Sequence, residues 1–307
     1  MAMQSFKHWM VALDLTNMDD IVLGYLNFLS TIHVPEKITF VHVVEGHAVT
    51  KEMASLFPEV KESGSLEQII REELSDKVKS FFDERETEIK FVIEEGATTE
   101  KILATLEEEN PDLLALGKKS GYEGEGVLAR KISKYTHCSL LFISENSQYR
   151  LKEIHLPVNF TKASARAVRQ AQQLADEQDA NLHIQHVYDY PKQFFPYIPT
   201  DQYSERMMAH LEKKYKKFKE KFELSKLPQC EFTVNEDGKE AEQIYNSVLR
   251  SRADLLMVGS KSKSSAAALL TEELADQLAS YHFGVPVLIY KEKDEHIGLL
   301  RSLLDKD

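Results

Sequence analysis

Short apolar runs alternate along the chain with longer amphipathic stretches. Residues 9–15 are mostly apolar, which is typical of a strand buried on both faces of a sheet. Residues 18–30 carry apolar side chains at near-helical spacing, which predicts a helix. The same pattern continues with predicted strands at 37–44, 89–94, 113–116 and 140–143, and predicted helices at 66–86, 97–109 and 127–135. Strands that alternate with helices over short connections predict a parallel sheet.

The chain contains this pattern twice. The segment from Asp112 to Ser120 recurs 142 residues later, from Asp254 to Ser262. Four further landmarks repeat in the same order at offsets of 142 to 147 residues: 11–15 with 156–160, 42–44 with 186–188, Gly96 with Gly238, and 140–143 with 287–290. A second long helix is expected at about 201–224. The repeat predicts an α/β protein of two tandem five-stranded domains, which we call the first copy (1–146) and the second copy (151–294), followed by a tail (295–307).

Composition and charge agree with this division. A chain of 307 residues is about twice the commonest domain size, and its 42% hydrophobic and 29% charged residues are typical of a globular protein. The net charge of −12 argues against nucleic acid as the main partner. Cys138 and Cys230 lie far apart and lack a C-x-x-C partner, so free thiols are expected. Without a signal-like or membrane-length apolar run, a cytoplasmic protein without membrane contact is predicted.

Ligands of such sheets bind beyond the carboxyl ends of the strands, where the strand order reverses. The candidate ligand-binding residues are therefore those at or just after the strand ends. In the first copy they are Asp14, Val43, Gly117, Lys118, Ser120 and Gly126. In the second copy they are Asn159, Val187, Gly259 and Ser262.

Several of these segments resemble the universal stress protein family. The residues that carry the resemblance are Asp14 at the end of its strand, the His42-Val43-Val44 strand end, Gly96 before a helix, the run from Pro111 to Gly117, and Gly284-Val-Pro-Val-Leu288 in the second copy. The resemblance covers nearly the whole chain, twice. It implies Rossmann-like domains of the adenine nucleotide alpha hydrolase type, packed through their last strands as a pseudo-dimer. It also implies a role in stress tolerance or signalling rather than in catalytic turnover of a substrate.

Members of this family that bind ATP carry G-x-x-G, nine further residues, and then Gly with Ser or Thr, together with an aspartate after the first strand. Such glycines let backbone N–H groups approach phosphate oxygens at a helix N-terminus. In the first copy Asp14 and Gly117 are present, but Ser120 replaces the second glycine. Gly126 takes the third place only nine residues after Gly117, so the loop is four residues shorter than in those members.

Nucleotide binding in the first copy nevertheless remains open. Lys118 and Lys119 could meet phosphate charge, and ATP with Mg²⁺ is the cofactor that the resemblance implies for this copy. The second copy departs further, because Asn159 replaces the aspartate, Ser262 the second glycine, and Thr271-Glu272 the final Gly-Ser. Its donor-rich segment at 259–265 leaves a small anion open, with a plain solvated loop as the alternative.

Other signals are weaker. His42 and His186 occupy equivalent strand ends, where a packing role is favoured over acid–base chemistry. The histidines lack H-x-x-x-H spacing, so no metal site is expected. An aromatic, proline-rich segment at 188–203 could form a contact surface or fold over the core, and the basic run at 213–221 is interpreted as a solvated helix face.

The function expected from these observations is a non-enzymatic stress-response protein without catalytic residues. It would act through ligand-dependent or partner-dependent interaction, with other proteins or by self-association. The alternative is an ATP-binding, slowly hydrolysing switch that uses the first copy.

Overall fold

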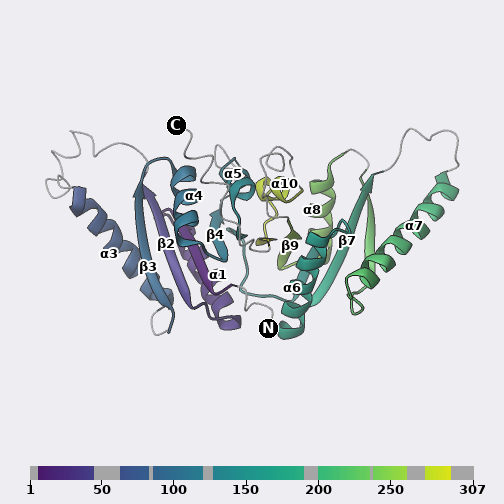
Figure 1. Cartoon of the computed structure of the whole chain (residues 1–307), viewed down its shortest axis with the longest axis horizontal. Helices are drawn as coiled ribbons and strands as arrows, with labels where there is room; N and C mark the ends of the chain where they lie inside the picture. Colours follow the sequence, from purple (N-terminus) through teal and green to yellow (C-terminus); the bar gives the residue numbers. More distant parts are fainter. Residues whose placement is uncertain are drawn as a thin grey trace.

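The computed structural model describes residues 6–44, 63–82, 86–119, 127–189, 200–235, 238–260 and 274–291. Within these ranges the strands form one ten-stranded sheet that runs through both copies (Figure 1). Its strand order is β3-β2-β1-β4-β5-β10-β9-β6-β7-β8. Each copy contributes five parallel strands, and the second half of the order mirrors the first. The predicted fold class is therefore confirmed.

The two copies have matching elements. Those of the first copy are β1 (His8–Leu13), α1 (Met18–Ile32), β2 (Lys37–Val44), α3 (Ser63–Phe82), β3 (Glu88–Glu95), α4 (Thr98–Glu109), β4 (Leu113–Lys118), α5 (Val127–Tyr135) and β5 (Ser139–Ser144). Those of the second copy are β6 (Glu153–Pro157), α6 (Lys162–Gln178), β7 (Asn181–Asp189), α7 (Thr200–Lys221), β8 (Cys230–Asn235), α8 (Glu240–Ser251), β9 (Leu255–Gly259), α10 (Leu274–Ser280) and β10 (Val287–Tyr290).

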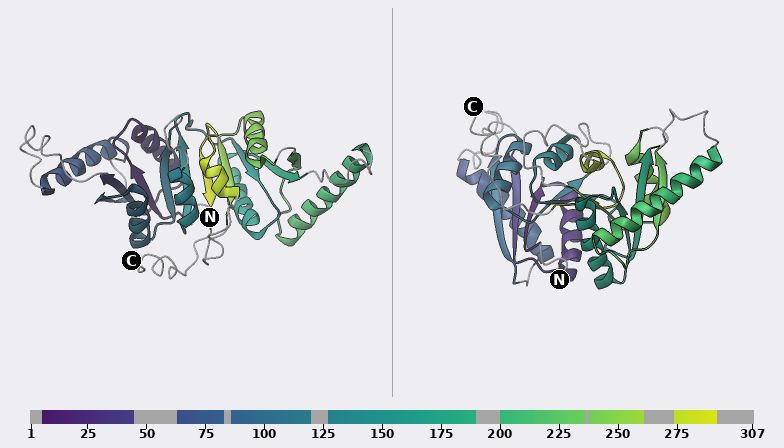
Figure 2. Two further views of the ribbon diagram at one scale, coloured as in Figure 1. Left: turned by 90° about the horizontal axis from the view of Figure 1, so that it is seen from above. Right: turned by 45° about the vertical axis from the view of Figure 1, so that its right-hand side comes forward.

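Helices cover both faces of the sheet, and each face has its own apolar core (Figure 2). Side chains of α1, α3, α6 and α7 belong to one core, and side chains of α4, α5, α8 and α10 belong to the other. Successive residues of β1 show the division, since Val11 packs into the first core and Met10 into the second. This alternation explains why the strands are apolar on both faces.

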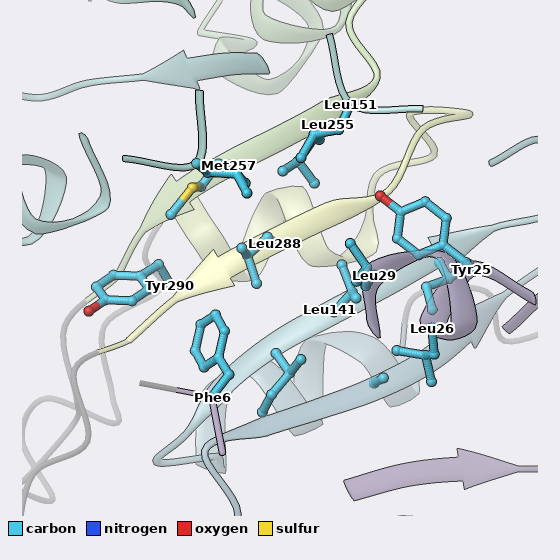
Figure 3. Packing of buried hydrophobic residues seen from close by; sticks show 14 of the residues in the cluster. Phe6, Tyr25, Leu26, Leu29, Leu141, Leu151, Leu255, Met257, Leu288 and Tyr290 are labelled. Atoms are coloured by element: carbon cyan, nitrogen blue, oxygen red, sulfur yellow. The ribbon is translucent and has the colours of Figure 1, made fainter. Parts of the chain in front are cut away.

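The two copies meet where β5 pairs antiparallel with β10, with Leu141 opposite Leu288 and Leu140 opposite Ile289. The predicted adjacency of the closing strands is thus confirmed. On one face of this junction, apolar side chains from both copies pack together, among them Phe6 and Tyr290 with ring centroids 6.2 Å apart (Figure 3). The junction is therefore a shared core rather than a contact-free linker.

The repeated aspartate before β4 and β9 has the same structural role in both copies. Asp112 Oδ2 accepts the backbone N–H groups of Lys7 and His8 at 3.0 and 2.9 Å. Asp254 Oδ2 accepts those of Lys152 and Glu153 at 2.8 and 3.0 Å. Each carboxylate thereby fixes the start of the central strand beside it, which accounts for the strongest motif of the repeat.

Element boundaries differ from the predicted ones by a few residues. β1 ends at Leu13 rather than at residue 15, because Leu15 has a positive φ of 58° that no strand accommodates. α3 lies at Ser63–Phe82 where residues 66–86 were predicted. None of the helices in the described ranges is long and apolar enough to cross a membrane.

Candidate functional site

The candidate residues of the first copy lie where β1 and β4 end side by side, at the point where the strand order reverses. Asp14 follows β1, Val43 lies in β2, and Gly117 and Lys118 are the last residues of β4. In the second copy Asn159 follows β6, Val187 lies in β7 and Gly259 ends β9. Ser120, Gly126 and Ser262 lie outside the described residues, as do most of the aromatic segment at 188–203 and the tail at 295–307.

The turn after β1 is held by two carboxylates. Asp14 Oδ1 accepts the N–H of Thr16 at 3.1 Å and its hydroxyl at 2.5 Å. The buried Asp19 in turn accepts the N–H groups of Asp14 and Leu15, at 3.0 and 2.8 Å. Burial, with the nearby Asp14 charge, raises the pKa of Asp19 despite these donors. These bonds hold Leu15 in the left-handed region, which costs a non-glycine residue roughly 1 kcal/mol or more.

The second copy builds the same turn from an amide. Asn159 Oδ1 accepts the N–H of Thr161 at 3.3 Å and its hydroxyl at 2.6 Å. Phe160 has a φ of 59°, close to that of Leu15. Because an amide oxygen and a carboxylate oxygen do the same work, this part of the role of Asp14 needs no charge.

The charge of Asp14 has its own partner. Lys119 Nζ lies 3.1 Å from Asp14 Oδ2 and donates to Thr16 Oγ1 at 2.6 Å. Partial burial raises the pKa of Asp14, but the bonds from Thr16 and Lys119 outweigh it and hold the pKa below its ordinary value. Both side chains remain in contact with solvent, Asp14 at 57% and Lys119 at 29% exposure. The site is therefore a neutral pair that a solute can reach.

Gly117 in β4 lies against α1, and Gly259 in β9 lies against α6. In each copy this is the helix that follows the first strand. A Cβ added to Gly117 would lie 2.6 Å from Met18 Cγ, at the start of α1. A Cβ on Gly259 would collide with the backbone carbonyl of Ala163, at the start of α6. Close helix–strand packing thus explains both glycines, whether or not a phosphate approaches them.

Lys118 points away from Asp14. It is buried, and its ammonium donates to Ala279 O at 2.7 Å and Tyr281 O at 2.5 Å, in the second copy. Its neighbour Lys119 is the lysine that the fold brings to the site. Sequence reasoning named both lysines, and alternation along a strand was the available signal, because successive side chains point to opposite faces.

The two strand-end histidines hold backbone. His42 Nδ1–H donates to Leu13 O at 2.9 Å, and His186 Nδ1–H donates to Val158 O at 2.7 Å. Burial lowers the pKa of His186, which keeps its ring neutral. Val43 and Val187 pack into the core on the α4 and α8 side of the sheet. The packing interpretation of the histidines fits these contacts.

Sequence reasoning gave no role to Thr16, which lies in the inspected segment after the first strand, and it missed Asp19. Thr16 stands two residues after Asp14, which is the spacing of an Asx turn and was a usable signal. Asp19 gives no such signal, because an acidic residue in a first helical turn usually serves the helix dipole. In the structure Asp19 is buried and accepts the N–H groups of Asp14 and Leu15, because the loop after β1 folds back over it.

Comparison with known proteins identifies a family for part of the chain. Residues 150–291 match the sequence model of the universal stress protein family. A universal stress protein from Archaeoglobus fulgidus has a similar structure, with a TM-score of 0.60 at 16% identity over 94% of this chain and 97% of that one. A functionally unknown protein from Pseudomonas aeruginosa gives 0.63 at 15% identity over 100% and 99%. Such low identities compare folds only. No curated protein sequence matches the chain.

Proposed function

We propose that the chain, whose residues 150–291 match the universal stress protein family, is a stress-response protein that acts by binding rather than by catalysis. In this proposal the units that act are the two copies, 1–146 and 151–294, with 295–307 as a tail. They respond to a small ligand or to a protein partner, which can be a second chain. The acidic net charge of −12 and the sparse cysteines favour a cytoplasmic protein that does not bind nucleic acid.

The observation that carries the proposal is the state of Asp14. A general base that works near neutral pH needs a pKa close to that pH. The pKa of Asp14 is instead lowered, and its second oxygen is held by Lys119. The lowered pKa makes Asp14 a weaker base toward the Thr16 hydroxyl, which lies 2.5 Å from Asp14 Oδ1. The second copy has a neutral amide in the same place.

One observation favours the second candidate, a nucleotide-binding switch in the first copy. Lys119 brings an accessible cation to the switch point, and Asp14 offers a carboxylate that can accept ligand hydroxyl or amino groups. The second copy has the uncharged amide of Asn159 in the place of the Asp14 carboxylate. If a nucleotide binds, the first copy is expected to hold it.

The test measures thermal stability with and without millimolar MgATP, in wild type, Asp14→Ala, Asp14→Asn and the matched control Asn159→Ala. We expect no stabilisation by ATP. Each alanine variant should lose roughly 1 kcal/mol, because the turn loses its acceptor, while Asp14→Asn should lose less. Stabilisation of wild type that disappears in Asp14→Asn and persists in Asn159→Ala would contradict the nucleotide-independent proposal and establish the second candidate.

A further inference from the structure

A lysine at the end of β4 crosses from the first copy into the second. The ammonium of Lys118 lies at the C-terminal end of α10, where it contacts Ala279 O and Tyr281 O. The last carbonyls of a helix have no partner within the helix, and the negative end of its dipole favours a cation. Lys118 therefore caps a helix of the other copy, from a side chain that is only 9% exposed.

A second lysine makes the reverse connection. Lys291 follows β10, and its ammonium donates to Ser133 O at 2.5 Å and Thr136 O at 2.8 Å, at the C-terminal end of α5. Its backbone is fixed by Ser139, whose hydroxyl donates to Lys291 O at 3.0 Å and accepts its N–H at 3.1 Å. The side chain is buried, with 4% exposure. Each copy thus caps one helix of the other.

The two capped helices are packed against each other across the junction (Figure 1). The Ser133 hydroxyl, near the end of α5, donates to Asp276 Oδ1, in the first turn of α10, at 2.9 Å. Both residues are buried, at 0% and 2% exposure. The end of α5 therefore lies beside the beginning of α10, so the helices run in opposite directions.

The Lys118 contacts begin at the candidate site of the first copy, and Lys291 follows Tyr290, which pairs with Gly259 in the candidate site of the second copy. Lys118 stands between Gly117, which packs on Met18, and Lys119, which holds Asp14. Among the described residues, helices α5 and α10 are the next elements after β4 and β9, the strands that end at the candidate sites. Because the Lys118 ammonium bonds to Ala279 O and Tyr281 O, a displacement of the β4 end strains the cap of α10. In the same way, a displacement of α10 strains the end of β4.

We propose that Lys118 and Lys291 form a reciprocal link that couples the site of each copy to the helix that follows the site strand of the other. The link goes beyond the proposed function, and it requires no particular ligand. It explains why buried cations are placed at the junction, where an apolar side chain would otherwise suffice.

The experiment measures amide hydrogen exchange in the full-length chain. The reporters are the Tyr281 N–H, which bonds to Gln277 O, and the Thr136 N–H, which bonds to Ile132 O. Lys118→Met should speed exchange at Tyr281, in the other copy, by about tenfold or more, because one buried and one half-buried carbonyl lose their donor. Lys291→Met should do the same at Thr136. A tenfold change corresponds to about 1.4 kcal/mol.

Two controls make the result specific. Lys101→Met removes a lysine of the same copy that pairs with Glu94, outside the link, and should leave Tyr281 unchanged, while Lys118→Arg should retain protection there, since a guanidinium also donates to carbonyls. A change confined to the mutated copy would overturn the proposal. So would a uniform rise at amides of both copies, because that would reflect general destabilisation instead of a directed link.

Discussion

Two neighbouring buried positions differ in chemical character between the two copies. In the first copy Met10 of β1 and Val41 of β2 belong to the apolar core beneath α4 and α5. Their repeat equivalents in the second copy are His155 and Gln185, with exposures of 1% and 0%. His155 Nε2–H donates to Gln185 Oε1 at 2.9 Å, and Gln185 Nε2 donates to Thr233 Oγ1 at 3.0 Å and Gln243 O at 3.3 Å. One fold therefore accepts either an apolar pair or a hydrogen-bonded network in the same place, as long as each polar group has partners.

The largest expected effect comes from introducing the histidine of this network into the first copy without its glutamine partner. Met10→His alone places an imidazole where no glutamine faces it, and we expect a loss of about 4 kcal/mol in the free energy of unfolding. Adding Val41→Gln supplies the partner and should recover part of that loss. Urea denaturation of the single and double variants measures both effects. Equal stability of the single variant and wild type would show that the first copy does not need an apolar pair here.

The buried His155 of the second copy also makes the stability of the protein depend on pH. Burial lowers the pKa of His155 to about 4 from the ordinary 6.5, despite the bond to Gln185. Between pH 4 and 6.5 the unfolded chain binds a proton at His155 that the folded chain does not bind. The contribution of the neutral His155 to the free energy of unfolding is therefore fully present above pH 6.5 and is lost as the pH falls to 4. The shift corresponds to about 3 kcal/mol.

The matching variant replaces the network by the pair of the first copy, His155→Met with Gln185→Val. We expect its stability to fall less than that of wild type between pH 6.5 and 4, by up to this amount. Denaturation midpoints measured across the pH range give the difference. Parallel pH profiles for the two proteins would contradict the assignment of His155.

The smallest expected effect concerns two equivalent helix ends. The residue after α4 is Asn110, with φ 45°, and the residue after α8 is Arg252, with φ 50°. Glycine adopts this conformation without strain and asparagine tolerates it better than arginine. Arg252→Gly should therefore raise stability by about 0.5–1 kcal/mol, and Asn110→Gly by only a few tenths. Thermal midpoints would show the order, and a larger gain at Asn110 would contradict it.

Much of the fold could be predicted because it depends on patterns that the chain repeats. The apolar strands, the amphipathic helices and the Asp112 and Asp254 motifs recur at nearly one offset, so a parallel sheet for each copy followed directly. The pairing of β5 with β10 came from the resemblance, since periodicity does not say which strand meets a second copy.

The site was harder to predict, because residue type does not tell where a side chain points. Gly117 and Gly259 resemble phosphate-binding glycines, yet the start of a helix lies against each of them. Lys118 and Lys119 are identical in kind, yet Lys118, at the end of β4, contacts α10, and Lys119, just after the strand, contacts Asp14. Asp14 follows β1 at the switch point, where one of its carboxylate oxygens holds the turn and the other contacts Lys119, a residue 105 positions away in the sequence.

The antiparallel meeting of β5 and β10 also has a consequence for a cell in which the amount of this protein changes. Two separate chains joined through such a short strand pairing would come apart on dilution. Here residues 145–152 tether the partners, so the two copies meet within one chain and not at the concentration of free chains. The pairing is then independent of expression level. Because the two copies are encoded in one chain, the sequence of each copy can change without the same change in the other. Position 118 can therefore be a lysine while its repeat equivalent, position 260, is a serine.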